Sequence, residues 1–382
     1  MRAILTLALT TGCGPTDPGT VPDDTAETTD ETPPVTFPDG VCLTHESDID
    51  NPAMVARLET NIERAREDMN LAGLSVSATL PDGTWLAAAG IADTGEDLEK
   101  SDLFRIGSVS KVFTATVLLQ LHDEGVLAID DPLDDWLPGW WDDEGITLRH
   151  LLQHTSGIVS YNYVGNFDQA AEYEPIELVQ WAKDNGPDPK FEPGSEYDYS
   201  NTGFVLLGLV IEEATGRPFH VELRERIIDP LGLDSTFFPP AEDIPCDQAR
   251  GFSGGVDVTD LADTSMGWTA GGMVSTARDV NTFQLALQEG ELLAPGTLAE
   301  MNTEVILPDG TGTYYGLGIF SSYDGDYGWS YGHTGGISGF SSYMYTVTGL
   351  DGSVTVLVNE EGQDLDDVVA YIWAAILDVE FP

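Results

Sequence analysis

Apolar positions along the chain predict a helix and two strands, then a long helical stretch, then a second group of strands. Asn51-Pro52 has the form of an N-cap followed by proline at the first helical position, and apolar residues continue at helical spacing as far as Met69. Two strand-like runs follow at 74–80 and 84–91, and the turn signal Pro81-Asp82-Gly83 joins them. We therefore expect a helix followed by a β-hairpin.

Residues 108–124 are apolar nearly all round after the first turn and end at Gly125, which is typical of a helix in the centre of a fold. Both ends of the chain are predicted to share one antiparallel sheet flanked by helices, with a mostly helical subdomain at about 126–280. The fold class is thus α+β. Further helices are expected at 147–154, 175–185, 201–215 and 364–377, and further strands at 314–320, 329–333, 341–347 and 353–358.

The charge of the chain excludes whole classes of partner. Its 382 residues are 41% hydrophobic, enough to fold, but 15 Lys and Arg against 66 Asp and Glu give a net charge of −51. A surface this acidic repels phosphate backbones and anionic lipid headgroups, so neither nucleic-acid binding nor electrostatic membrane docking is expected. Many carboxylates with few lysines suit high salt, where counterions screen the repulsion, and salt adaptation is therefore a hypothesis.

The N-terminal residues 1–13 have the features of an export signal. Met1-Arg2 precede a short apolar stretch, and small residues then lead to Cys13, as in bacterial lipoprotein signals whose cysteine is lipidated, although Thr10 stands where leucine is usual. The alternatives are an ordinary signal peptide and a frayed N-terminus. Residues 14–45 are rich in Thr, Pro and acidic residues and are predicted to be a solvated tether, which leaves 46–382 as the folded domain.

These features predict an exported protein, periplasmic or at the cell surface, that meets a membrane only through a lipid on Cys13. If Cys13 carries a lipid, Cys42 and Cys246 remain as an even pair in an oxidising compartment. A disulfide between them is the prediction, and two free cysteines are the alternative that the sequence leaves open.

Ser108 and Lys111 are the first candidates for chemistry. Of the four lysines, only Lys111 has a serine three residues before it, and positions i and i+3 of a helix share a face. The Ser108 hydroxyl lies at the helix start, where free N–H groups favour negative charge, and burial of Lys111 favours its neutral form. A neutral amine can take a proton from serine, which predicts a nucleophile and its base. A helix-capping serine with a snorkelling lysine is the structural alternative.

Two further motifs place polar groups on turns. Tyr199-Ser200-Asn201 precedes an apolar helix and offers a phenol that can relay a proton and an amide that can bind a carbonyl group. His333-Thr334-Gly335-Gly336 ends a predicted strand, where glycines let a substrate lie close and leave N–H groups free to donate.

In this order the three motifs resemble the serine β-lactamase and D,D-peptidase superfamily, most closely its class C and D-alanyl-D-alanine carboxypeptidase branch. The likeness covers about 50–380 and includes the stretches 104–107, 151–157, 230–233 and 270–276. It implies the β-lactamase/transpeptidase-like fold. It also implies a serine hydrolase that works through an acyl-enzyme on a small-molecule or peptide substrate, without metal or organic cofactor.

The resemblance assigns catalytic roles residue by residue. Ser108 would be the nucleophile and Lys111 its general base. Tyr199 would pass protons to the leaving group and activate the deacylating water. The backbone N–H groups of Ser108 and Gly336 would form the oxyanion hole.

Substrate-binding roles follow in the same way. Asn201 would orient the substrate amide, and His333, Thr334 and Gly335 would line the strand edge and contact a substrate carboxylate. His333 stands where efficient lactamases usually carry lysine, and a mostly neutral imidazole holds a carboxylate less firmly than an ammonium group does. D,D-carboxypeptidase, D-amino peptidase or esterase activity is therefore expected ahead of strong β-lactamase activity. A non-turnover penicillin-binding or cell-wall-sensing protein is the alternative, against which the intact catalytic trio argues.

Other motifs predict no second site. The stretch 251–255 matches the G-x-S-x-G nucleophile elbow but lacks a strand before it and a helix after it, so a loop is expected. His150 and His154 could share a helix face as metal ligands do, yet no third ligand is evident and no metal site is predicted. Tyr161 and Tyr163 would either line the substrate site or pack into the fold.

Overall fold

A seven-stranded antiparallel sheet is the frame of the structure, a computed structural model that describes residues 47–141, 145–187 and 189–379. The strand order is β3-β2-β1-β11-β10-β9-β8, so the two ends of the chain meet where β1 pairs with β11. This confirms the predicted sheet. Its strands are β1 (Gly73–Leu80), β2 (Gly83–Asp93), β3 (Glu96–Asp97), β8 (Phe320–Asp324), β9 (Gly328–Ile337), β10 (Phe340–Val347) and β11 (Gly352–Val358).

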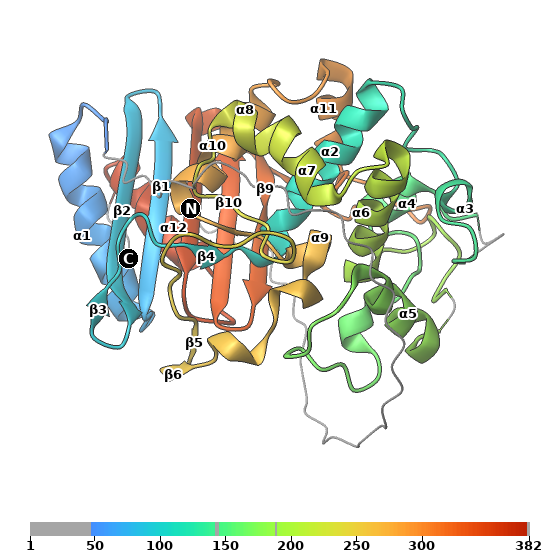
Figure 1. Cartoon of the computed structure of the whole chain (residues 1–382). Helices are drawn as coiled ribbons and strands as arrows, with labels where there is room; N and C mark the ends of the chain where they lie inside the picture. Colours follow the sequence, from blue (N-terminus) through green and yellow to red (C-terminus); the bar gives the residue numbers. More distant parts are fainter. Residues whose placement is uncertain (1–46, 142–144, 188, 380–382) are drawn as a thin grey trace.

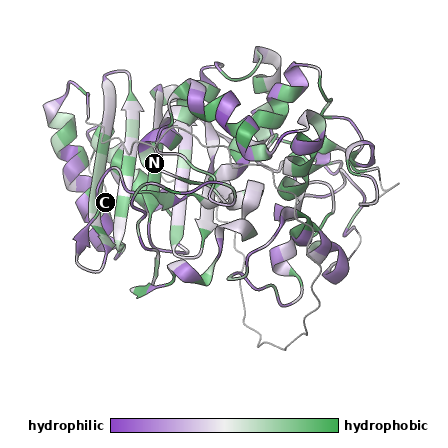
Figure 2. Cartoon of the chain, viewed as in Figure 1, coloured by the Kyte–Doolittle hydropathy of each residue, from purple (hydrophilic) through white to green (hydrophobic). Residues whose placement is uncertain are grey.

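Helices cover both faces of this sheet (Figure 1). On one face α1 and α12 pack on each other and on the apolar residues of β1 and β11. On the other face α10 crosses β1, β10 and β11. Successive residues of a strand point to opposite faces, so Val354 and Val356 of β11 face α12 while Ser353 and Thr355 reach Asn281 of α10. In α1 the hydrophobic and hydrophilic residues recur at helical spacing (Figure 2), and its buried residues face the sheet.

The predicted central helix is α2, whose residues are buried on almost every side. It lies between the sheet and the helices α3 to α7 (Figure 1). The described helices are α1 (Pro52–Asp68), α2 (Ser110–Asp123), α3 (Leu133–Trp136), α4 (Leu148–Leu152), α5 (Pro175–Asn185), α6 (Asn201–Thr215), α7 (Phe219–Leu223), α8 (Asp229–Leu231), α9 (Trp268–Gly271), α10 (Ala277–Gln288), α11 (Pro295–Met301) and α12 (Asp366–Ile376). Short antiparallel pairs are formed by β4 (Phe104–Arg105) with β7 (Val274–Ser275) and by β5 (Phe252–Ser253) with β6 (Val256–Asp257).

The predicted strand at 314–320 is wrong. Only its last residue belongs to a strand, β8, and the rest is an irregular segment. Tyr314 has a φ of +55° and Gly318 a φ of +82°, both outside the extended region. A side chain at Gly316 would lie 1.9 Å from the carbonyl oxygen of Met301, so the backbone approach that glycine allows replaces strand pairing here.

The expected loop at 251–255 is a tight hairpin between β5 and β6. Ser253 lies in one strand of that hairpin and the strand β6, not a helix, comes next, so the α/β-hydrolase elbow is excluded. Within the described part of the chain, no helix is long and apolar enough to span a bilayer.

The predicted export signal, the lipidated Cys13, the tether and Cys42 lie outside the described residues. Cys246 is disulfide-bonded.

Candidate active site

Ser108 lies on the 3-10 turn Gly107–Val109, which connects β4 to α2. The turn depends on Gly107, whose φ is +50°, and a side chain there would come within 2.9 Å of the Gly336 nitrogen. Nearly all residues of α2 that follow are buried, so the helix is fixed in the core and its first turn is held in place. Ser108 itself is partly exposed at the start of this buried helix.

Lys111 is fully buried one turn into the same segment. Its Nζ donates to Ser108 Oγ at 3.2 Å, to Asn201 Oδ1 at 2.7 Å and to the Ala270 carbonyl at 2.6 Å. None of these acceptors is a carboxylate. Burial therefore lowers the pKa of Lys111 well below its ordinary value, and the amine can serve as a base.

Tyr199 completes the trio from the segment before α6. Its ring centroid lies 4.8 Å from Lys111 Nζ, and its hydroxyl has no hydrogen-bond partner among the described residues. Burial raises the pKa of this phenol well above its ordinary value, and the Ser108 hydroxyl nearby offsets part of that shift. The phenol is therefore neutral and available to give or relay a proton.

Asn201 is fixed by a network that the sequence did not predict. Asn201 accepts from Lys111 through its Oδ1, and its Nδ2 donates to Asn162 Oδ1 at 3.0 Å. Ser160 Oγ donates to the same Asn162 oxygen at 2.6 Å and accepts the Asn201 N–H at 2.9 Å. A serine and an asparagine soon after the His-Thr-Ser-Gly stretch were the available signal.

The two tyrosines that flank Asn162 have opposite placements. Tyr161 is 1% exposed and its hydroxyl donates to the Met266 carbonyl, so it packs into the fold. Tyr163 is 61% exposed.

Strand β9 passes directly beside the serine. A side chain at Gly335 would lie 2.2 Å from the Ile106 carbonyl oxygen and 3.0 Å from the Ser108 nitrogen. Thr334 and Gly336 are exposed. Glycine at 335 thus lets β9 approach the Ser108 turn closely. An oxyanion hole formed by the N–H groups of Ser108 and Gly336 stays a prediction.

His333 points away from solvent. The ring is 1% exposed, its Nε2 is 3.0 Å from the Tyr315 hydroxyl and its Nδ1 is 2.5 Å from the Thr334 carbonyl oxygen. Burial and the nearby Lys111 charge lower the pKa of His333 to about 3, so the imidazole is neutral. Its contact with a substrate carboxylate stays a prediction. Tyr315, which holds the ring, was not singled out in the sequence.

The metal pair suggested by sequence spacing does not form. His150 closes a capping box at the start of α4, where its Nδ1 accepts the Thr147 N–H at 3.2 Å. His154 is buried among aromatic rings. Over residues 47–141, 145–187 and 189–379, no group of three or more His, Cys, Asp or Glu could hold a metal ion.

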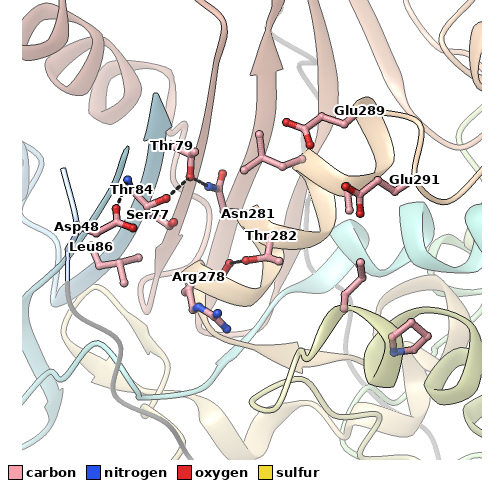
Figure 3. A pocket seen from close by; sticks show the side chains of 14 residues that line it. Asp48, Ser77, Thr79, Thr84, Leu86, Arg278, Asn281, Thr282, Glu289 and Glu291 are labelled. Carbon is pink, nitrogen blue, oxygen red and sulfur yellow. Dashed lines mark hydrogen bonds between the residues drawn. The ribbon is translucent and has the colours of Figure 1, made fainter. Parts of the chain in front are cut away.

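A cavity of about 520 Å³ lies elsewhere, between α10, the β1–β2 hairpin and α8 (Figure 3). It contains none of the predicted site residues. Its buried Asn281 donates to Thr79 and accepts from Ser353, so this asparagine ties α10 to the sheet.

The chain is similar in sequence to known proteins of one family. The Beta-lactamase family model matches residues 58–378. Penicillin-binding protein 4* of Bacillus subtilis is 34% identical over 47% of this chain and 40% of its own length. Penicillin-binding protein 4 of Amycolatopsis lactamdurans is 29% identical over 80% of this chain and 85% of its own.

Among solved structures, a D-stereospecific amidohydrolase from a Streptomyces species is 34% identical, with a TM-score of 0.73 over 85% of this chain and 99% of that one. The match to the family model spans most of the chain and includes all three motifs. The chain therefore belongs to the Beta-lactamase family, within the serine β-lactamase and D,D-peptidase superfamily that its motifs resemble.

Proposed function

We propose that this protein is a serine hydrolase that acylates Ser108 and acts on amides or esters. The observation that carries the proposal is the bond between Lys111 and Ser108: a fully buried amine, with no carboxylate among its bonded acceptors, lies 3.2 Å from the serine oxygen. This is the geometry of a base beside the nucleophile that it activates.

The reaction follows from the placement of these groups. Neutral Lys111 takes the Ser108 proton as Oγ attacks the substrate carbonyl carbon, and the N–H groups of Ser108 and Gly336 stabilise the oxyanion. The proton passes through the Tyr199 hydroxyl to the departing amine or alcohol, and the acyl-enzyme remains. Water then gives a proton to the same pair and attacks the ester carbonyl carbon. As the bond to Ser108 Oγ breaks, that proton returns to Oγ, the acid is released and the free enzyme is restored.

We propose D-amino acid amides, short D-amino acid peptides and esters as the substrate class. The neutral, buried His333 supports this choice, because the strand offers no ammonium group at that position to bind a β-lactam carboxylate firmly. The Streptomyces amidohydrolase to which the chain is similar is D-stereospecific, which points the same way. β-Lactam hydrolysis, if it occurs, should be slow.

A substrate panel tests the proposal. D-Phenylalanine amide, a peptide ending in D-Ala-D-Ala, a short-chain p-nitrophenyl ester and a cephalosporin are each offered to the wild type and to Ser108→Ala, with intact mass spectrometry of the protein. We expect turnover of the amide or ester and a transient acyl adduct that Ser108→Ala lacks. Wild-type rates in Ser108→Ala would refute the nucleophile. A persistent adduct without product would favour the sensing protein.

We also propose that the protein is exported and anchored by a lipid on Cys13, with Cys42 bonded to Cys246. The disulfide at Cys246 supports an oxidising compartment. Palmitate labelling and fractionation of cells that express the full chain, compared with Cys13→Ser, test the anchor. Label that persists in Cys13→Ser would reject it, and a non-reducing peptide map without the Cys42–Cys246 link would reject the pairing.

A further inference from the structure

A buried histidine that has no role in the reaction proposed above lies against Tyr199. The side chain of His154 is 1% exposed, and its ring centroid is 4.1 Å from that of Tyr199. The backbone of His154 has a φ of +56°, a left-handed conformation that is uncommon for residues other than glycine. Such a conformation persists only where the surrounding contacts fix it.

His154 is bonded to the turn on both sides of the tyrosine. The Asp198 N–H donates to the His154 carbonyl at 2.9 Å, and the Ser200 N–H donates to His154 Nδ1 at 3.1 Å. Because Nδ1 accepts, the ring proton is assigned to Nε2, which has no partner in the part of the chain that the structure describes. The bonds that flank residue 199, together with the ring contact, fix where its side chain starts and how it leans.

The groups that face the imidazole keep it uncharged. Burial is the main cause that lowers the pKa of His154 well below its ordinary value, and the positive charge that Lys111 carries when protonated adds to it. A neutral ring can support the Tyr199 ring without repelling the Lys111 ammonium that forms during the reaction. The other rings that pack on His154 are those of Tyr197, Phe204 and Tyr315.

We propose that His154 is a positioning residue for Tyr199: it holds the turn from both sides and supports the ring, so that the phenol stays beside Lys111 and Ser108. This inference rests on the proposed function, in which Tyr199 protonates the leaving group. A displacement of about 1 Å can cost about 10²-fold in rate, and a general acid supplies about 10²- to 10⁴-fold. Removal of the His154 side chain should therefore lower the rate only by part of the factor that Tyr199 supplies as general acid.

Two substrates with the same acyl group isolate that contribution. The amide nitrogen of D-phenylalanine amide must be protonated before it leaves, whereas the p-nitrophenyl ester of D-phenylalanine releases a stable anion without a proton. Both form the same acyl-enzyme, so kcat/KM differs only through acylation. A residue that acts through Tyr199 must therefore affect the amide far more than the ester.

The variants separate the backbone from the side chain. His154→Gly adopts a φ of +56° without strain but removes both the ring and the acceptor. His154→Asn tolerates the same φ and restores an acceptor for the Ser200 N–H. His150→Asn is the matched control, because it removes another histidine that accepts a local backbone bond, four residues away and outside the trio.

We expect His154→Gly to lower kcat/KM about 10- to 100-fold for the amide and less than about 3-fold for the ester, with His154→Asn recovering most of the loss. In a Tyr199→Phe background the same substitution should cost less than about 2-fold, because residues that act as a unit are not additive. His150→Asn should leave the amide-to-ester ratio unchanged. If His154→Gly does not fold, His154→Asn replaces it in the double-mutant cycle with Tyr199→Phe. Its loss of kcat/KM must then be confined to the amide and must disappear in the Tyr199→Phe background.

Equal losses on both substrates, additivity with Tyr199→Phe, or wild-type amide kinetics in a folded His154→Gly would overturn the inference. The proposed function fails in a different way. In that case the wild type leaves both substrates intact and Ser108 is not acylated.

Discussion

Gly335 is the position where one added methyl group should damage the site most. In Gly335→Ala the new Cβ would lie 2.2 Å from the Ile106 carbonyl oxygen and 2.3 Å from Ser342 Oγ. These two oxygens are themselves joined by a 2.8 Å hydrogen bond, so neither can withdraw alone. Carbon and oxygen need well over 3 Å, so β9 must separate from the Ser108 turn by about 1 Å.

The separation should cost both stability and rate. Overpacking of this kind costs about 1–3 kcal/mol of unfolding free energy, and contact with backbone rather than a flexible side chain places the estimate at the upper end. The same movement pulls the Gly336 N–H away from the Ser108 N–H. Losing one oxyanion donor lowers kcat by about 10²- to 10³-fold, so acylation should slow by that order.

Thermal unfolding and the acylation burst with a p-nitrophenyl ester measure the two effects. Gly336→Ala is the steric control for stability: nothing lies within 4 Å of its Cβ position, so its unfolding free energy should change by less than about 0.5 kcal/mol. If Gly335→Ala melts with the wild type and acylates at the wild-type rate, the close approach of β9 to Ser108 is wrong.

Three other outcomes are expected. The wild-type pH profile of kcat/KM should show no limb from His333 between pH 4 and 8, since a pKa of about 3 leaves the ring neutral there; a limb near 6.5 that His333→Gln abolishes would contradict this. Activity should instead rise with pH as the Lys111 ammonium loses its proton, and level off well below pH 10.5. Asn162→Ala removes the partner of Asn201 Nδ2 and should raise KM for the amide about 5-fold, the worth of one hydrogen bond, while ester acylation by Ser108 stays unchanged; equal effects on both substrates would count against it.

The sequence predicted the part of the site that depends on local spacing. Ser108 and Lys111 share a helical turn, and residues 201–215 were predicted as a helix that begins at Asn201. The sequence thus placed Ser108 and Asn201, the two side chains that bond to Lys111, at the starts of two helices. The family resemblance implied that the strand carrying His333 to Gly336 lies beside the serine, and the close approach of Gly335 to the Ser108 turn agrees with it.

The missed contacts come from segments without regular periodicity. Ser160 and Asn162 reach Asn201 from the single 3-10 turn Tyr161–Tyr163 and its N-cap. The Ala270 carbonyl accepts from Lys111 as a main-chain group, which residue identity does not reveal. The strand prediction at 314–320 is wrong because the apolar residues there are buried by an irregular segment, in which the Tyr315 hydroxyl bonds to His333. Helix α10 was missed although Thr276, which caps it, and Asp279 in its first turn are a recognisable start signal.

Salt should screen the surface charges of this protein but not the buried catalytic groups. The net charge of −51 is carried by side chains in water, where salt screens repulsion over a Debye length of about 8 Å at physiological ionic strength. Lys111 is fully buried and bonds to a hydroxyl, an amide and a carbonyl oxygen, and the histidines near it are neutral. Molar sodium chloride should therefore raise the unfolding midpoint, by about 1–2 °C for each kcal/mol of repulsion relieved, and leave the acid limb of the kcat/KM profile in place. If the acid limb of the kcat/KM profile shifts with salt as the unfolding midpoint does, surface carboxylates set the pKa of Lys111. If the unfolding midpoint does not change with salt, the hypothesis of salt adaptation is wrong.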